Sequence, residues 1–267
     1  MAGGRQPKDA TAVAFLLRIF RKAGLELLIL GIDTTTLACS VALLDDEALL
    51  AEFTLNIRKT HSERLMPLID ALLKESSIER EQLQAVAVAA GPGSFTGIRI
   101  GVSTARALAQ GLAIPAVGVS TLQALAEAVP SPGALICPLL DARRNELYSA
   151  LYRREPAPPR SLELLIPPAA VELGPFTERL KRYGEPIIFV GEGLAAHGPA
   201  LASALGELAV LPPAPQRVCR AAGVALCGRR LLEKSPGASF HELLPQYLRR
   251  PEAERRLAER KGNAPCP

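Results

Sequence analysis

The residues of this chain best suited to chemistry lie in a glycine-rich turn. Residues 91–101 read GPGSFTGIRIG, and the apolar run AVAVAA at 85–90 precedes them. The run predicts a strand buried on both faces, and residues 96–111 after the turn have the length of a helix. A strand, a glycine turn and a helix in this order direct the free N–H groups and the positive end of the helix dipole into the turn. Such a turn is suited to an anion.

An aspartate followed by hydroxyl residues is the second candidate. Asp33 ends a predicted buried strand, and three threonines follow it in a first hairpin. An acid and hydroxyl groups at a hairpin are able to hold a phosphate or a metal-bound water, although these residue types are common in any turn. The candidate residues for a vestigial loop with weak nucleotide or phosphate binding are Asp33, Thr34, Thr35, Gly91, Gly93, Ser94 and Thr96, and ordinary turn residues are the alternative interpretation.

The helix after the glycine turn has one face of very small residues. They recur every four positions, at Gly97, Gly101, Ala105 and Ala109. Such a face allows another element to approach closely, as small-residue spacings do between membrane helices. Two interpretations stay open at this point, namely tight packing on the chain's own sheet and docking of a partner. A second side of the helix carries a polar stripe of Arg99, Ser103, Arg106 and Gln110.

Few residues are placed to bind a metal. His61 is the sole histidine of the N-terminal half, and a second ligand one helical turn later is missing because position 65 is Leu. We therefore predict that His61 is a capping or surface residue rather than a metal ligand. No Ser–His–Asp order and no HExxH motif is visible, and the glycine turn lacks the Gly-Lys-Ser/Thr of a P-loop.

Apolar runs and turn residues predict the elements that position these groups. Three strands form an antiparallel meander ahead of a helix at 60–73, which opens with a capping box of Thr60 and Glu63. The second half of the chain repeats this order of strands followed by helices, and it contains another glycine turn at 191–193. The predicted strands are 27–33, 38–44, 48–55, 85–90, 116–119, 134–140, 146–152, 161–166 and 187–190, and the further helices are 96–111, 120–128 and 217–234.

Proline and glycine residues near the middle of the chain predict two lobes, with a terminal segment on each side. Pro130-Ser131-Pro132-Gly133 is the expected linker. The predicted lobes are residues 26–130 and 131–250, with a disordered extension at 1–25 and a charged, disordered tail at 251–267. Two similar halves of strands followed by glycine turns and helices indicate a duplicated α/β architecture.

Composition limits the classes of protein to consider. The chain has 267 residues and a formal net charge of +4, which permits a nucleic-acid surface without requiring one. Its five cysteines are scattered without a CxxC pair, which favours a reducing compartment over a disulfide framework. No apolar run approaches membrane-spanning length. We expect a cytoplasmic protein that makes no membrane contact.

Four segments in order resemble one family. Residues 29–35 (ILGIDTT), 90–101 (AGPGSFTGIRIG), 138–148 (PLLDARRNELY) and 245–249 (PQYLR) are similar to the bacterial TsaB family, formerly YeaZ, of tRNA threonylcarbamoyladenosine biosynthesis proteins. The resemblance spans residues 27–250, which is nearly everything but the two ends of the chain.

The resemblance implies a fold and a role. The fold would be the two-lobed actin-like fold of actin, Hsp70 and sugar kinases, with duplicated mixed-sheet domains. The role would be a non-catalytic scaffold in the cytoplasm that forms a heterodimer with the related catalytic subunit TsaD and helps to recruit the ATPase TsaE. ATP and a metal would then act in the partner subunits, tRNA would be reached through the complex, and this chain would have no cofactor of its own. A homodimer and a monomer both stay open for the chain when it is alone.

The resemblance also implies a docking surface for TsaD. Two helices of the first lobe would build it, and here they correspond to residues 61–73 and 96–110. The residues expected to dock are His61, Leu65, Leu68, Ile69, Leu72, Gly97, Ile98, Gly101, Val102, Ala105 and Ala109.

Three functions are alternatives to the scaffold, and the first is that of the catalytic relative itself. The catalytic relative carries two histidines one helical turn apart, and it opens its first hairpin with Glu-Thr-Ser-Cys where this chain has Asp33-Thr34-Thr35-Thr36. Without the metal pair the transfer reaction lacks its electrophilic group. The remaining alternatives are a small-molecule kinase of the actin-like fold and a glycoprotease-like metallopeptidase, and neither has a visible substrate or metal constellation.

Overall fold

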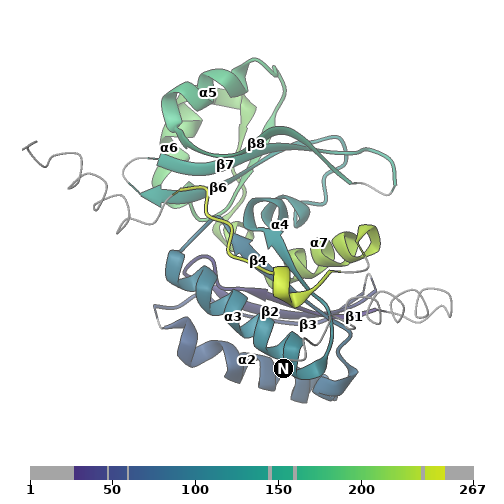
Figure 1. Cartoon of the computed structure of the whole chain (residues 1–267). Coiled ribbons are helices and arrows are strands. Elements are labelled where there is room, and N and C mark those ends of the chain that lie inside the picture. The colour runs from purple at the N-terminus through teal and green to yellow at the C-terminus, as the bar shows by residue number, and fades with distance from the viewer. Residues whose placement is uncertain are drawn as a thin grey trace, which may run out of the picture.

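Two five-stranded sheets, one in each lobe, organise the molecule (Figure 1). The computed structural model describes residues 27–46, 48–58, 60–143, 146–158, 161–235 and 238–249. The extension at 1–25 and the tail at 251–267 lie outside the described residues, so the disorder expected there stays a prediction.

The first sheet has the strand order β3-β2-β1-β4-β5. The hairpins β1–β2 and β2–β3 are antiparallel, whereas β4 is parallel to β1 and β5 is parallel to β4. The central strands β1 and β4 are buried almost throughout, as their continuous apolar runs predict. The bounds are β1 (Leu28–Asp33), β2 (Cys39–Asp45), β3 (Ala48–Leu55), β4 (Ala85–Gly91) and β5 (Ala116–Ser120).

Helices cover both faces of the first sheet. Alternate strand residues point to opposite faces, so Leu30 and Ile32 pack under α2 (His61–Glu75) and α3 (Phe95–Leu112), while Ile29 packs on the other side. That other side is covered by α7 (Ala221–Lys234), which contacts β1, β2 and β4.

The second sheet repeats the topology of the first. Its order is β10-β9-β6-β7-β8, with antiparallel β6–β7–β8 and parallel β6–β9–β10. The predicted duplicated two-lobed α/β fold is therefore confirmed. The bounds are β6 (Leu135–Arg143), β7 (Glu146–Arg154), β8 (Leu162–Glu172), β9 (Ile187–Val190) and β10 (Ala209–Val210), with α5 (Leu173–Lys181) and α6 (Leu194–Leu205) on the outer face.

The two lobes exchange one helix each. Helix α4 (Thr121–Glu127) follows the first sheet in the chain, yet its Leu122 and Leu125 pack on the inner face of the second sheet. Helix α7 comes from the second half and covers the first sheet. The helices α4 and α7 also contact each other, so they form the middle layer between the sheets (Figure 1). In space, α7 thus belongs with the first sheet, although the sequence prediction assigned residues 131–250 to the second lobe.

The start of α7 is attached to the first sheet by polar contacts. The N–H of Ala221 donates to Ser40 Oγ at 2.9 Å, and that of Ala222 donates to Glu52 Oε1 at 2.9 Å. Glu52 Oε2 also pairs with Arg220 Nε at 3.0 Å. Strands β2 and β3 therefore supply the cap that satisfies the first N–H groups of this helix.

Most expected elements are present, with some corrections. The last helix begins at Ala221 rather than 217, because 3-10 turn η3 (Ala214–Arg217) precedes it. Strand β8 continues to Glu172 through two prolines, which an edge strand tolerates. Helix α5 was not predicted. Thr60 is the N-cap of α2, but its side chain makes no capping hydrogen bond. Further 3-10 turns are η1 (Arg80–Gln82), η2 (Gly206–Leu208) and η4 (Phe240–Glu242).

Candidate functional site

The glycine turn between β4 and α3 is covered by the chain's own backbone. Ser94 is the N-cap of α3, and its Oγ accepts the N–H of Gly97 at 3.3 Å. The N–H of Ser94 itself donates to Thr35 O at 2.6 Å. From the C-terminal segment, the N–H of Gln246 donates to Ala90 O at 2.7 Å. Several N–H groups and carbonyls that could bind a ligand at this turn are thus hydrogen-bonded within the chain.

Glycine is required at Gly91 because of this close cover. Its φ is +125°, a region that other residues rarely adopt, and a Cβ there would overlap Gln246 O. The contact with Gln246 was not predicted. The one sequence signal for it was the PQYLR segment at 245–249, whose contacts could not be read from the sequence.

The first hairpin lies against the glycine turn, as the predicted loop requires. Asp33 Oδ1 accepts the N–H of Thr35 at 2.8 Å and its hydroxyl at 2.7 Å, and Thr34 Oγ1 donates to Gly97 O at 2.7 Å. The structure thus brings together the hairpin and turn residues proposed for phosphate binding. Asp33, Thr34 and Thr35 are all buried, and weak nucleotide binding at this loop stays a prediction.

Acidic groups at the boundary between the lobes have raised pKa values. Burial raises the pKa of Asp33, against the opposing effects of the Thr35 hydrogen bonds and of His61. Its Oδ2 has no hydrogen-bond partner within the described residues. Burial also raises the pKa of Glu192, assisted by the charges of Asp141 and Asp33. The protein interior here disfavours negative charge rather than attracting a further anion.

The small-residue face of α3 is sealed inside the chain. Gly97, Gly101, Ala105 and Ala109 are all buried. A Cβ at Gly97 would overlap Thr34 O, and one at Gly101 would overlap Thr34 Oγ1. The tight packing is therefore against the chain's own first hairpin and sheet. The prediction that these four residues dock a partner is wrong.

Five further predicted docking residues also lie in the core. On α2 they are Leu65, Ile69 and Leu72, and on α3 they are Ile98 and Val102. They fill the space between the two helices and the first sheet, which is the function that helical apolar spacing has in most globular proteins. Within the predicted set only His61 and Leu68 are partly accessible.

The accessible surface of α2 and α3 consists of other residues. Helix α2 exposes Met66, whose relative exposure is 39%, together with Pro67 and Asp70. Helix α3 exposes Arg99, Ser103, Ala107 and Gln110, which include most of the polar stripe. The two helices contact each other on the outer side of the first sheet. We call this surface of α2 and α3 the outer face.

His61 is engaged within the chain. Its Nε2 lies 2.8 Å from Thr36 O, and the residue one turn later is the core residue Leu65. In the part of the chain that the structure describes, no three His, Cys, Asp or Glu side chains are grouped to hold a metal ion. The four described cysteines are buried and free, and burial raises the pKa of Cys137 and Cys227 to about 12.

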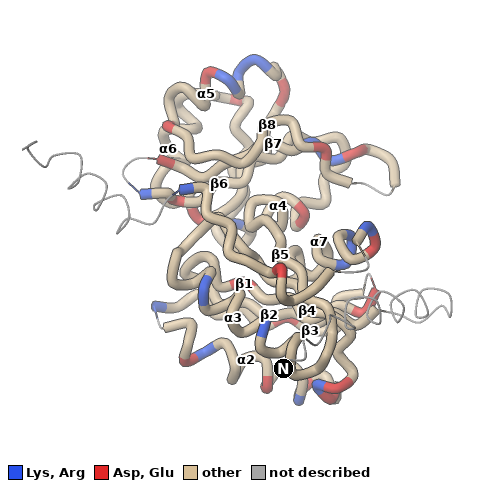
Figure 2. Tube along the Cα trace, viewed as in Figure 1, with Lys and Arg blue, Asp and Glu red and all other residues tan. Residues whose placement is uncertain are grey.

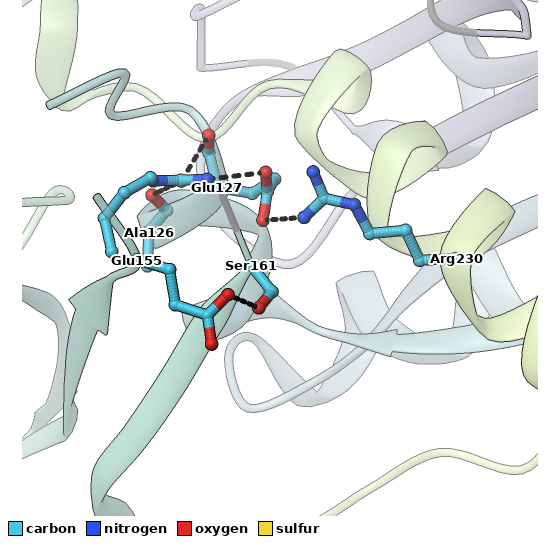
Figure 3. A network of polar contacts seen from close by, with 6 residues as sticks. Ala126, Glu127, Glu155, Ser161 and Arg230 are labelled. Atoms are coloured by element: carbon cyan, nitrogen blue, oxygen red, sulfur yellow. Dashed lines mark hydrogen bonds and ion pairs between the residues drawn. The ribbon is translucent and has the colours of Figure 1, made fainter. Parts of the chain in front are cut away.

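A buried ion network joins the two lobes (Figure 3). Glu127, at the end of α4, accepts from Arg154 Nη1 of β7 at 2.9 Å and lies 2.8 Å from Arg230 Nη1 of α7. Arg154 Nη2 also donates to the carbonyls of Ala126 and Glu127 at 2.9 Å. The Glu127 side chain is 2% exposed. Sequence reasoning did not predict this network.

Comparisons with known proteins identify similar chains. A family model described as TsaD, tRNA N6-adenosine threonylcarbamoyltransferase, matches residues 48–257. The tRNA threonylcarbamoyladenosine biosynthesis protein TsaB of Bacillus subtilis is 35% identical over 86% of this chain and 98% of its own length. The protein of the same name in Escherichia coli is 36% identical over 48% of this chain and 55% of its own length.

A solved structure agrees with the sequence comparisons. YeaZ from Pseudomonas aeruginosa superposes with a TM-score of 0.68 at 26% identity, covering 83% of this chain and all of that one. Among the helices of the described segments, none is both long enough and apolar enough to cross a bilayer.

Proposed function

This chain belongs to the TsaB family of tRNA threonylcarbamoyladenosine biosynthesis proteins, and from that premise we propose that it is the non-catalytic scaffold that binds the catalytic subunit TsaD. The observation that carries the proposal is the match to a TsaB protein over 98% of that relative's length. The TsaD-type family model over residues 48–257 supports common descent with the catalytic subunit. In this proposal the chain also helps to recruit the ATPase TsaE in the cytoplasm.

The non-catalytic part of the proposal rests on the start of α2. A metal-binding pair would need a ligand at position 65, and Leu65 is 1% exposed in the core. His61 is held by its contact with Thr36 O. Neither residue is placed to hold the metal on which the catalytic relative depends.

The docking surface that we propose is the outer face of α2 and α3. Both helices are packed on the sheet through apolar residues, so the outer face is rigid before a partner arrives. Met66 and Leu68 supply apolar area on α2, and Arg99 and Ser103 supply polar groups on α3. This mixed composition is typical of interfaces that also exist as free surfaces. The same face would pair two copies when TsaD is absent.

Size-exclusion chromatography with purified TsaD tests the proposal. We expect a complex with the wild-type chain and its loss with Met66→Arg, which replaces an exposed apolar side chain of the outer face by a charge. Leu164→Arg is the matched control, because Leu164 is 50% exposed on β8 in the other lobe. A threonylcarbamoyladenosine assay on unmodified tRNA should require both subunits.

Two outcomes contradict the proposal. The first is an unchanged complex with Met66→Arg, which would place the docking surface elsewhere. The second is modification of tRNA by this chain without TsaD, which would show that it is itself the catalyst.

A further inference from the structure

We propose that Arg99 is the charged anchor of the outer face, that Tyr247 positions it, and that it binds a carboxylate side chain of the catalytic subunit. The inference rests on the proposed function, because it names one contact of the same surface. It assigns a role to the C-terminal segment 243–249, which we call the strap and which the proposed function does not use.

The strap is fixed at three points along its length. Leu243 is buried in the core of the first lobe, and the N–H of Gln246 is bonded to Ala90 O. Arg249 Nη2 pairs with Glu146 Oε2 of the second lobe at 2.7 Å. In Figure 1 the strap is the yellow trace that leaves η4 and runs up to the second lobe. Tyr247 lies between the second and third of these attachments, so its backbone position is set on both sides.

Tyr247 in turn holds the side chain of Arg99. Its ring stacks on that of Phe95, with centroids 5.0 Å apart and planes at 28°. The guanidinium carbon of Arg99 lies 3.9 Å from the Phe95 ring centroid, and Arg99 Nε donates to the Tyr247 hydroxyl at 3.1 Å. A cation over a ring face and a hydrogen bond at Nε restrict the arrangements of the long side chain.

The held guanidinium still has unused donors. Arg99 is exposed, and neither of its Nη atoms has a hydrogen-bond or ion-pair partner among the residues that the structure describes. The Nη groups of arginine form a fork that matches a carboxylate. Because the side chain is already ordered, a partner would lose less entropy on binding it than on binding a mobile arginine. Arginine and tyrosine are also the residue types most often found at the energetic centre of interfaces.

The charges of the outer face favour a carboxylate as the occupant. Helix α3 contains Arg99 and Arg106 and no acidic residue. Figure 2 shows positions of positive charge alone on α3 and of both signs on α2. On α2, which packs against α3, Glu63 and Asp70 are exposed. These acids would repel the continuous phosphates of an RNA, whereas a protein surface is able to place one acid opposite Arg99.

Binding of purified TsaD, measured by calorimetry at two salt concentrations, tests the inference. Arg99→Ala should weaken binding about tenfold or more and reduce its salt dependence. Arg99→Lys keeps the charge but loses the fork, so we expect most of the same loss. Tyr247→Phe keeps the ring stack and removes only the hydroxyl, and it should weaken binding about threefold or more. Arg179→Ala, an exposed arginine of α5, is the matched control and should bind as the wild type does.

The double variant separates positioning from a structural effect. If Tyr247 acts through Arg99, then Arg99→Ala with Tyr247→Phe should bind no more weakly than Arg99→Ala alone. Thermal unfolding of each variant shows whether a loss of binding follows a loss of folding. Additive losses, or unchanged affinity of Arg99→Ala, would overturn the inference and leave the proposed function intact. Reduced tRNA binding with unchanged TsaD binding would assign Arg99 to phosphate instead. Failure of the wild-type chain to bind TsaD would overturn both.

Discussion

At the scale of single residues, Asp33 is a buried acid whose pKa is raised by its burial. It ends the central strand β1, and it is 1% exposed. One carboxylate oxygen accepts two hydrogen bonds from Thr35, while the other has no partner among the described residues. Burial disfavours the charged form of a carboxylate when only one of its two oxygens accepts hydrogen bonds. Asp33 is therefore expected to reduce stability when it is ionised.

Replacement of Asp33 by Asn should have a pH-dependent effect on stability. Burial raises the folded-state pKa of Asp33 above the ordinary value of 3.8, so the native state binds this proton more tightly than the unfolded chain does. The stabilising contribution is present in full below 3.8 and is lost as the pH rises through the raised pKa. The free energy of unfolding of Asp33→Asn, relative to wild type, should therefore increase over that rise in pH.

Urea unfolding of both proteins from about pH 3.5 to about pH 7 measures this difference. Asp70→Asn, at an exposed position of α2, is the control that separates burial from the loss of an acid. A relative stability of Asp33→Asn that falls as the pH rises would contradict the assignment of burial as the dominant cause.

At the scale of elements, α3 shows how one helix serves two surfaces. Its small residues let the first hairpin approach until Thr34 contacts the helix backbone, and its polar stripe remains outside. The close approach also brings the N–H of Ser94 to Thr35 O. The small face thus sets the position of the helix, and the outer face is available for a partner.

Two glycines of α3 should respond in opposite ways to alanine. At Gly97 the added Cβ would overlap the Thr34 carbonyl, so Gly97→Ala should lower the free energy of unfolding by about 2–4 kcal/mol. At Gly111, in the same helix, nothing lies within 4 Å of an added Cβ. Gly111→Ala should therefore stabilise the protein by about 0.5–1 kcal/mol. Denaturant unfolding of the pair checks both signs, and equal effects would contradict the packing described for the small face.

Local signals predicted the elements better than their contacts. The apolar runs of β1 and β4 and the glycine turn could be read directly, because each depends on neighbouring residues. The spacing of Gly97 and Gly101 predicted a small face, but it could not say what covers that face. Contacts such as Gln246 with Ala90 join residues far apart in the chain, and periodicity carries no information about them.

At the scale of the whole molecule, the lobes are joined by more than a linker. Five layers alternate as helices, sheet, helices, sheet and helices, and the middle layer consists of the exchanged helices α4 and α7 (Figure 1). The strap adds a further connection through Arg249 and Glu146. A scaffold that presents one face to a partner benefits from lobes held in a single arrangement, because less order must then be gained on binding.

Among these connections, we expect loss of the Glu127 network to lower the free energy of unfolding most. Glu127 neutralises Arg154 and Arg230, and the Arg154 side chain is 5% exposed, so water cannot replace the lost carboxylate there. Glu127→Gln keeps the shape of the side chain and removes the negative charge that both arginines contact. Removing one partner of a buried pair typically costs about 3–5 kcal/mol, and we expect a loss of about 3 kcal/mol in the free energy of unfolding.

Glu185→Gln is the matched control, since Glu185 pairs with Arg153 at 2.9 Å on the surface of the second lobe, and its effect should be much smaller. Urea unfolding of the two variants compares them directly, and equal stability would show that the Glu127 network does not stabilise the connection between the lobes.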